Sequence, residues 1–169
     1  HKNIVVAGGT GSGKTTFLNM LIGELERTGD ETERLVIIED TPEIKTDNIN
    51  TVFLRTTKDV DMTRLLASSL RLRPDRIIVG EVRDGAALAM IKAWNTGHPG
   101  GLTSVHANDA FAALSRIDLL IREASAMPVP EIIGLGVDMV VFIEATREGR
   151  RVKEIIEVEG YENEEFITE

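Results

Sequence analysis

The stretch "VVAGGTGSGKTTFL", Val5–Leu18, decides the fold class of this chain. Residues 8–15 within it match the pattern G-x-x-x-x-G-K-[ST] at every fixed position. Glycines let several backbone N–H groups approach phosphate oxygens, and the N-terminus of a following helix adds partial positive charge. A short apolar run precedes the motif and an amphipathic segment from Thr15 to about Glu26 follows it. Strand, loop and helix therefore come in the order that a phosphate-binding loop (P-loop) requires.

The loop predicts a bound nucleotide and a magnesium ion. We expect Lys14 to reach the β- and γ-phosphates from a position in the loop rather than in the core, and the Thr15 hydroxyl to hold Mg²⁺. The predicted phosphate-binding residues are Gly8, Gly9, Thr10, Gly11, Ser12, Gly13, Lys14, Thr15 and Thr16. The motif leaves the reaction open, because kinases, GTPase switches, helicases and secretion motors can all carry such a loop.

Strand-like and helix-like segments alternate through most of the chain. Apolar runs predict strands over 3–7, 34–40, 51–55, 76–81 and 101–107, with amphipathic helices among them. Asp59, Asp61 and Asp84 are candidate N-caps for two of these helices. Residues 139–145 and 150–158 flank the turn sequence "TREG" and predict an antiparallel hairpin. This order predicts one α/β domain whose mostly parallel sheet is flanked by helices on both faces.

Composition and charge narrow the class of protein. The chain has 169 residues and a net charge of −9, and residues 154–169 contain seven glutamates and no Lys or Arg. An acidic chain without a broad basic face is a poor candidate for direct nucleic-acid binding. The absence of cysteine excludes disulfides and fits a reducing cytosol. No apolar run approaches the roughly 20 residues of a membrane span. Because the sequence opens with His1 and turns strand-like by Asn3, we expect an excised domain.

Two glutamates and one histidine lie at the carboxyl ends of predicted strands. Glu39 lies in "VIIEDTPE", Glu81 ends "RIIVGE", and His106 follows "TSV". Open α/β sheets bind ligands at the carboxyl ends of their strands, so we expect these side chains beside the phosphates. A carboxylate near Mg²⁺ and a group that orients water are what hydrolysis needs. A second histidine, His98 in "NTGHPGG", is interpreted as a loop residue.

Five arginines crowd one part of the chain: Arg64, Arg71, Arg73, Arg76 and Arg83. One interpretation is a solvated face with ordinary ion pairs. The other is that one of them stabilises the charge that develops during phosphoryl transfer, often in a neighbouring subunit's site. The sequence leaves both open.

Four segments in order resemble the bacterial secretion ATPases, and most closely the Trb-type conjugal-transfer ATPases of type IV secretion systems. They are "VAGGTGSGKTT", "ERLVIIEDTPEI", "SLRLRPDRIIVGEVRDGAAL" and "AWNTGHPGGLTSVHAN", which follow the Walker A, Asp-box, Walker B and His-box order. The resemblance spans Lys2 to Tyr161. It implies a C-terminal RecA-like ATPase domain over residues 1–161, followed by an acidic tail over 162–169. The family's N-terminal domain has no counterpart here.

The resemblance also implies roles and partners. Lys14 and Thr15 would bind phosphate and Mg²⁺, Glu39 would activate water, and Glu81 would support the metal site. His106 would sense the γ-phosphate, with Arg83 as a partner of that network. Members of the family form homohexamers, hydrolyse ATP at subunit junctions, and act with inner-membrane secretion-channel proteins on the cytoplasmic side of that membrane. They power pilus assembly or substrate transfer.

Other functions stay open at this point. A related pilus or tight-adherence system would use the same motor, and a nucleic-acid translocase would use the same RecA-like core. A basic, aromatic-lined channel would favour the translocase, but the composition offers 4% aromatic residues and a negative net charge. A regulatory module that binds a nucleotide without hydrolysing it is a further alternative, against which Glu39, Glu81 and His106 argue. No segment suggests the lid of a small-molecule kinase.

Overall fold

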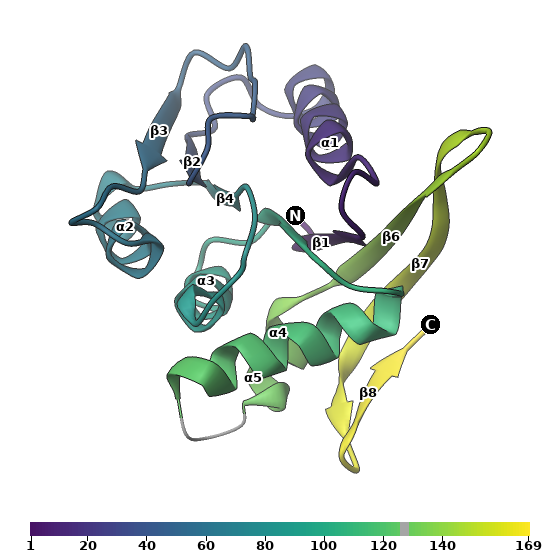
Figure 1. Cartoon of the computed structure of the whole chain (residues 1–169). Helices are drawn as coiled ribbons and strands as arrows, with labels where there is room; N and C mark the ends of the chain where they lie inside the picture. Colours follow the sequence, from purple (N-terminus) through teal and green to yellow (C-terminus); the bar gives the residue numbers. More distant parts are fainter. Residues whose placement is uncertain (126–128) are drawn as a thin grey trace.

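A computed structural model describes residues 1–125 and 129–169 of the chain (Figure 1). The elements are β1 (Ile4–Gly8), α1 (Lys14–Thr28), β2 (Leu35–Glu39), β3 (Thr51–Arg55), α2 (Met62–Ser69), the 3₁₀ turn η1 (Leu70–Leu72), β4 (Arg76–Val79), α3 (Ala86–Asn95), β5 (Leu102–Val105), α4 (Ala110–Ala124), α5 (Pro130–Gly136), β6 (Met139–Thr146), β7 (Gly149–Glu162) and β8 (Glu165–Thr168). None of the helices described is long and apolar enough to cross a bilayer.

The strands form one eight-stranded sheet in the order β3-β2-β4-β5-β1-β6-β7-β8. The first six strands in this spatial order, β3, β2, β4, β5, β1 and β6, are parallel to one another. β7 runs antiparallel to β6, and β8 runs antiparallel to β7. The predicted mostly parallel sheet and terminal antiparallel hairpin are thus confirmed. Since parallel strands share one direction, the loops after β1, β2, β4 and β5 all leave from the same edge of the sheet.

Helices cover both faces of the sheet, as the alternation predicted. α1 lies on one face, and α2, α3, α4 and α5 lie on the other (Figure 1). Successive residues of β1 point to opposite faces: Val6 packs with Leu18 and Ile22 of α1, whereas Val5 and Ala7 belong to the larger cluster under the other helices. Continuous apolar runs in the central strands follow from this burial on both faces.

Three details differ from the sequence expectations. Only Asp61 of the two candidates caps α2, by accepting from the Arg64 N–H, because Asp59 lies too far before the helix. Asp84 accepts from the Ala86 N–H, but the N-cap position of α3 is Gly85. Helix α5, which begins with Pro130 in its first turn, was not anticipated. Proline suits that position because its missing N–H would have no partner inside the helix.

Residues 162–169, expected to be an acidic tail, contain strand β8. The turn between β7 and β8 places Asn163 and Glu164 at φ 52° and 67°, as a two-residue hairpin turn requires. Along β8 exposed and half-buried residues alternate, and the half-buried Phe166 packs against Tyr161 of β7. This apolar contact on one face is the physical reason for a strand where charge alone predicts a solvated tail.

Candidate functional site

The P-loop connects β1 to α1 at the carboxyl edge of the sheet. Gly11 and Gly13 adopt φ 73° and 95°, a left-handed conformation that glycine reaches at no steric cost. The Gly13 carbonyl accepts the Phe17 N–H at 2.9 Å, which starts the hydrogen-bond ladder of α1. The loop therefore turns directly into a helix N-terminus, where backbone N–H groups and the helix dipole favour an anion.

Lys14 is the first residue of α1 and only 7% exposed, so the expectation of a loop residue outside the core is wrong. Its Nζ donates to the carbonyls of Gly8 and Gly9 at 3.1 and 3.2 Å. Burial lowers the pKa of Lys14; the negative charge of Glu81 opposes this shift and the positive charge of Arg83 adds to it. The ammonium group is thus held, partly desolvated, over the loop that would receive phosphate.

Glu81 gathers three basic side chains. One of its oxygens lies 2.8 Å from Nε2 of His106 and 3.9 Å from Nζ of Lys14, and the other pairs with Arg83. The carboxylate raises the pKa of Arg83, first through their hydrogen bond and then through its charge. His106 also lies close to Lys14, with 3.3 Å between its Nδ1 and the lysine Nζ. Lys14, Glu81, Arg83 and His106 therefore meet at one point, although they come from three separate segments of the chain.

Glu39 ends β2 and is 3% exposed. Its Oε1 accepts the backbone N–H groups of Glu43 and Ile44 at 2.9 and 2.8 Å. Its Oε2 is buried and has no hydrogen-bond partner among the residues described. Buried carboxylate oxygens without partners are uncommon and costly, so Oε2 is free to accept a hydrogen bond from a ligand or a water molecule.

A small acidic pocket of about 60 Å³ joins these groups. Its lining residues are Thr15, Glu39, Asp40, Thr41, Glu43, Gly80, Glu81 and Arg83. The volume suffices for a few water molecules or a small hydrated cation. The Thr15 hydroxyl donates to Glu43 at 2.9 Å, a contact that the sequence analysis did not foresee.

The donors of this pocket fit Mg²⁺. Hydroxyl and carboxylate oxygens are the ligands that Mg²⁺ prefers, and the ion commonly takes one or two protein oxygens together with phosphate and water. Within residues 1–125 and 129–169, no group of three His, Cys, Asp or Glu side chains is placed to hold a metal ion. A magnesium ion here would consequently depend on phosphate oxygens as well as on Thr15 and Glu81.

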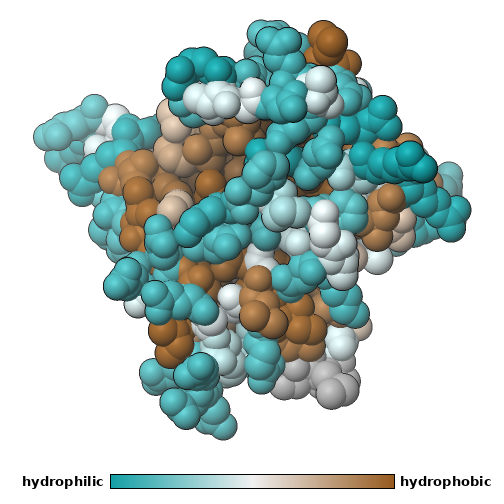
Figure 2. Space-filling view, turned by 180° about the vertical axis from the view of Figure 1, so that it is seen from behind, coloured by the Kyte–Doolittle hydropathy of each residue, from teal (hydrophilic) through white to brown (hydrophobic). Residues whose placement is uncertain are grey.

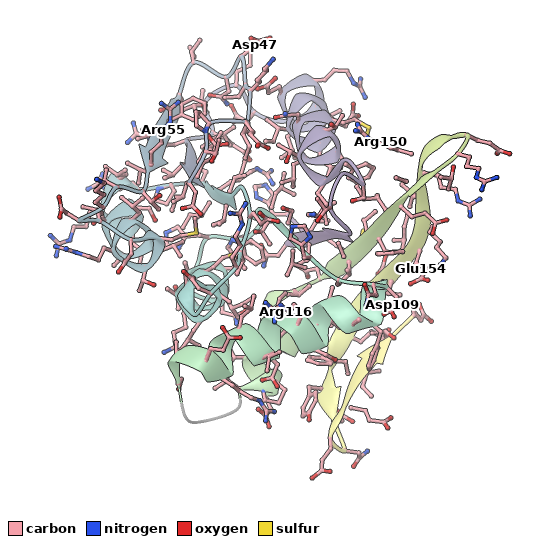
Figure 3. All side chains as sticks on the ribbon, viewed as in Figure 1. Asp47, Arg55, Asp109, Arg116, Arg150 and Glu154 are labelled. Carbon is pink, nitrogen blue, oxygen red and sulfur yellow. The ribbon has the colours of Figure 1, made fainter. Side chains whose placement is uncertain are left out.

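Two larger hollows flank the P-loop. One, of about 550 Å³, is lined by Gly9, Thr10, His106, Ala107, Asn108, Ala112, Ser115, Arg116 and Leu119. Arg116 of α4, labelled in Figure 3, contributes a positive charge to this lining. The other hollow, of about 380 Å³, is lined by Ser12, Gly13, Thr16, Phe17, Met20, Ile143, Arg150, Arg151 and Val152. It is mostly apolar and lies between α1 and the projecting β6–β7 hairpin, where Figure 2 shows apolar side chains gathered.

Arg150 reaches from that hairpin toward α1 (Figure 3). Its side chain lies directly over Gly13, since a Cβ built on this glycine would come within 2.7 Å of the arginine Cδ. No motif in the sequence marks this residue, because only the fold of the hairpin places it beside the loop. The basic character of the β6–β7 turn, with Arg147, Arg150 and Arg151, was the available signal.

The other arginines of the crowded segment do not converge on the site. Arg76 is buried and pairs with Glu33 at 2.6 Å, while Arg64 donates to the Asp59 carbonyl at 3.0 Å. Arg71 and Arg73 are exposed beyond α2. Of the five, only Arg83 joins the P-loop network. His98 lies in a loop as expected, its Nδ1 3.2 Å from the Ala93 carbonyl oxygen.

The chain is similar to known proteins. The family described as "Type II/IV secretion system protein" matches residues 1–141. The conjugal transfer protein TrbB of Rhizobium radiobacter is 57% identical over 167 residues, which are 99% of this chain and 51% of that protein. The type IV secretion system protein VirB11 of Bartonella quintana is 42% identical, over 83% of this chain and 41% of that protein. The chain thus spans about half the length of the curated relatives that it matches.

A solved structure supports the same grouping. The crystal structure of the VirB11 ATPase from the Brucella suis type IV secretion system superposes with a TM-score of 0.84 at 34% identity. The match covers 91% of this chain and 47% of that one.

Proposed function

Because the chain belongs to the family of type II/IV secretion system proteins, we propose that it is the ATP-hydrolysing domain of a motor subunit in a type IV secretion or conjugation machine. The observation that carries the proposal is the meeting of Lys14, Glu81 and His106 at the P-loop, next to the buried Glu39. This arrangement supplies phosphate binding and a candidate base at one point. The names of the relatives, among them a VirB11 ATPase, support ATP as the substrate.

The three hollows around the P-loop suggest how Mg·ATP lies. The acidic pocket at Thr15 and Glu81 would take the metal ion, whose chemistry when bound is to neutralise phosphate charge. The hollow beside His106 and Arg116 would face the γ-phosphate. The apolar hollow beyond Thr16 would take the adenine ring of ATP, with the Arg150 guanidinium against the π-face of that ring.

Glu39 is the proposed general base. Its Oε1 is held by two backbone N–H groups, so the carboxylate has a fixed orientation, and its Oε2 is left to accept a proton from water in the acidic pocket. Glu81 holds Lys14 and His106 together before the nucleotide arrives. Phosphate oxygens would compete with Glu81 for both side chains, and this exchange would couple the presence of the γ-phosphate to the position of His106.

We propose that the protein acts as a homohexamer on the cytoplasmic face of the inner membrane, together with channel proteins of the secretion machine, and that its sites are completed across subunit junctions. His106 is exposed and lines the hollow of about 550 Å³, and Arg83 is an exposed residue of the acidic pocket. Both positions support a site that a neighbouring subunit completes.

The test is ATP turnover measured against protein concentration, with mass determined by light scattering in the same samples. We expect turnover per chain to rise steeply as the hexamer appears. Constant turnover per chain in a sample that remains monomeric would overturn the shared-site arrangement. Failure to bind ATP at all would overturn the nucleotide site itself.

A further inference from the structure

The acidic end of the chain is an ordered surface. β7 continues past its last pair with β6, Met139–Glu157, and pairs there with β8 alone. Glu159, Glu162, Glu164, Glu165 and Glu169 of this region are all exposed. Within the described residues, none of these five carboxylates has a Lys, Arg or His side chain within ion-pair distance. Glu162 and Glu165 are moreover direct cross-strand neighbours, an arrangement of like charges that destabilises a hairpin.

An aromatic pocket lies beside these carboxylates. Phe166 stacks edge-on against Tyr161 and Phe111, with ring centroids 5.0 and 6.3 Å apart. Phe111, on the first turn of α4, is 47% exposed. The pocket has a volume of about 380 Å³ and is lined by Phe111, Ser115, Asp118, Pro130, Tyr161, Glu164, Glu165 and Phe166. Asp118 Oδ1 is buried with no hydrogen-bond partner among the residues described.

Protection of an edge strand explains part of this surface. Charged side chains on an edge strand prevent its pairing with other chains, and β8 is the edge of the sheet. That explanation covers the glutamates of β8. It does not explain why Phe111 is exposed or why Glu164 and Glu165 line an aromatic hollow, because charges that only protect an edge strand need no aromatic rings beside them.

A surface of aromatic rings with carboxylates at its edge is suited to bind cationic side chains. An Arg or Lys placed over an aromatic ring gains cation–π attraction, and nearby carboxylates add charge pairing. Cytoplasmic loops of inner-membrane proteins carry an excess of Lys and Arg. An anionic lipid surface, by contrast, would repel this end of the molecule.

We propose that Phe111, Tyr161, Glu164, Glu165 and Phe166, here called the acidic hairpin face, dock an Arg- and Lys-rich cytoplasmic loop of an inner-membrane channel protein. This inference rests on the proposed function, which places the chain beside the channel proteins of an inner-membrane secretion machine. The face lies at the β8 end of the sheet, whereas the P-loop lies after the central strand β1 (Figure 1). A partner could therefore bind here while the nucleotide site stays open.

The probe is a fluorescent peptide that alternates arginine with serine, and a glutamate–serine peptide serves as its negative counterpart. Binding is followed by fluorescence anisotropy at low salt and again at physiological salt, where screening extends over about 8 Å. The wild-type chain should bind the arginine peptide and ignore the glutamate peptide. The double variant Glu164→Gln, Glu165→Gln should bind about fivefold more weakly. Phe111→Leu, which keeps an apolar side chain but removes the π-face, should bind about twofold more weakly.

The matched control removes the same charge elsewhere. Glu31→Gln with Asp47→Asn neutralises two exposed carboxylates that line a separate pocket of about 300 Å³ beside Leu25. This pocket lies near the end of the molecule opposite β8, where Figure 3 marks Asp47. This pair should leave the peptide affinity unchanged. Equal losses in both pairs would overturn the proposal, because they would indicate attraction by net charge alone. Absence of peptide binding to the wild type would overturn it as well.

Two parallel readouts keep this inference separate from the proposed function. ATP binding is measured for every variant and should not change, since the acidic hairpin face contributes nothing to the P-loop. ATP binding without peptide binding would end the docking proposal and leave the motor proposal standing. If the Glu164/Glu165 variant changes the mass of the assembly by light scattering, the face is a contact between copies of the chain, and the docking proposal is wrong.

Discussion

Replacing Gly8 by alanine should damage the P-loop through a steric conflict that its neighbour Gly9 does not have. A Cβ on Gly8 would lie 2.4 Å from Oγ of Ser12 and 2.5 Å from the carbonyl oxygen of Ile143. The Ser12 hydroxyl can rotate, but the Ile143 carbonyl belongs to β6, the strand that pairs with Gly8. Relief of this clash requires the two strands to separate. Gly9 has no atom within 4 Å of the equivalent position.

The magnitude follows from comparing the two variants. Forcing an extra methyl group into a packed site costs about 1–3 kcal/mol. Both variants restrict the unfolded chain by a similar amount, so that contribution cancels in the difference. The Gly8→Ala chain should therefore be less stable than the Gly9→Ala chain by about 1–3 kcal/mol. With a urea m-value of about 2 kcal/mol/M, the two unfolding midpoints should differ by about 0.5–1.5 M.

Urea unfolding of both variants without nucleotide measures this difference, and equal m-values confirm that the same transition is compared. Coincident midpoints would refute the reasoning, because they would mean that β1 and β6 accommodate the methyl group. A Gly9→Ala chain less stable than Gly8→Ala would contradict the geometry of the loop itself.

Three further predictions test the site and the core. Since burial lowers the pKa of Lys14 while Glu81 raises it, Glu81→Gln should lower that pKa further. Lys14 would then lose its charge at a lower pH, so ATP affinity should begin to fall at a lower pH than in the wild type. The dissociation constant for ATP, measured as a function of pH, tests this. Arg150→Ala should weaken ATP binding about two- to fivefold and leave the binding of inorganic triphosphate unchanged in a competition assay, because the arginine is proposed to contact the adenine ring. Equal losses for both ligands would indicate that Arg150 contacts the phosphates instead. Trp94→Phe should destabilise the fold by about 1–3 kcal/mol, since it leaves the buried Ile77 carbonyl without the indole N–H that donates to it at 3.1 Å; an unchanged urea midpoint would contradict this.

Much of the fold could be predicted because local patterns and the sheet agree. The strand expected over 3–7 is observed at Ile4–Gly8, and the helix after the P-loop begins at Lys14. Glu39, Glu81 and His106 were expected beside the phosphates because each lies at the carboxyl end of a predicted strand. β2, β4 and β5 are indeed neighbouring parallel strands, so their carboxyl ends lie along one edge. Topology alone therefore brings these side chains together.

The missed features depend on contacts that no local pattern encodes. Glu43 reaches Thr15 through the course of the loop after β2, and Arg150 covers Gly13 because the β6–β7 hairpin projects past α1. β8 was missed because its turn places Glu164 at positive φ, where Gly, Asn or Asp is the usual signal. The packing of Phe166 on Tyr161 outweighs that unfavourable turn residue, and only the folded chain shows it.

The most direct test of the central claim compares two neighbouring carboxylates of the acidic pocket. Glu39→Gln keeps an oxygen for the Glu43 and Ile44 N–H groups but removes the proposed base. In the control Asp40→Asn, the altered carboxylate already accepts the Thr56 hydroxyl at 2.8 Å. In the assembled protein, Glu39→Gln should retain ATP binding and lose turnover by about a hundredfold or more, while Asp40→Asn stays within a few-fold of wild type. Turnover by Glu39→Gln within a few-fold of wild type would contradict the account.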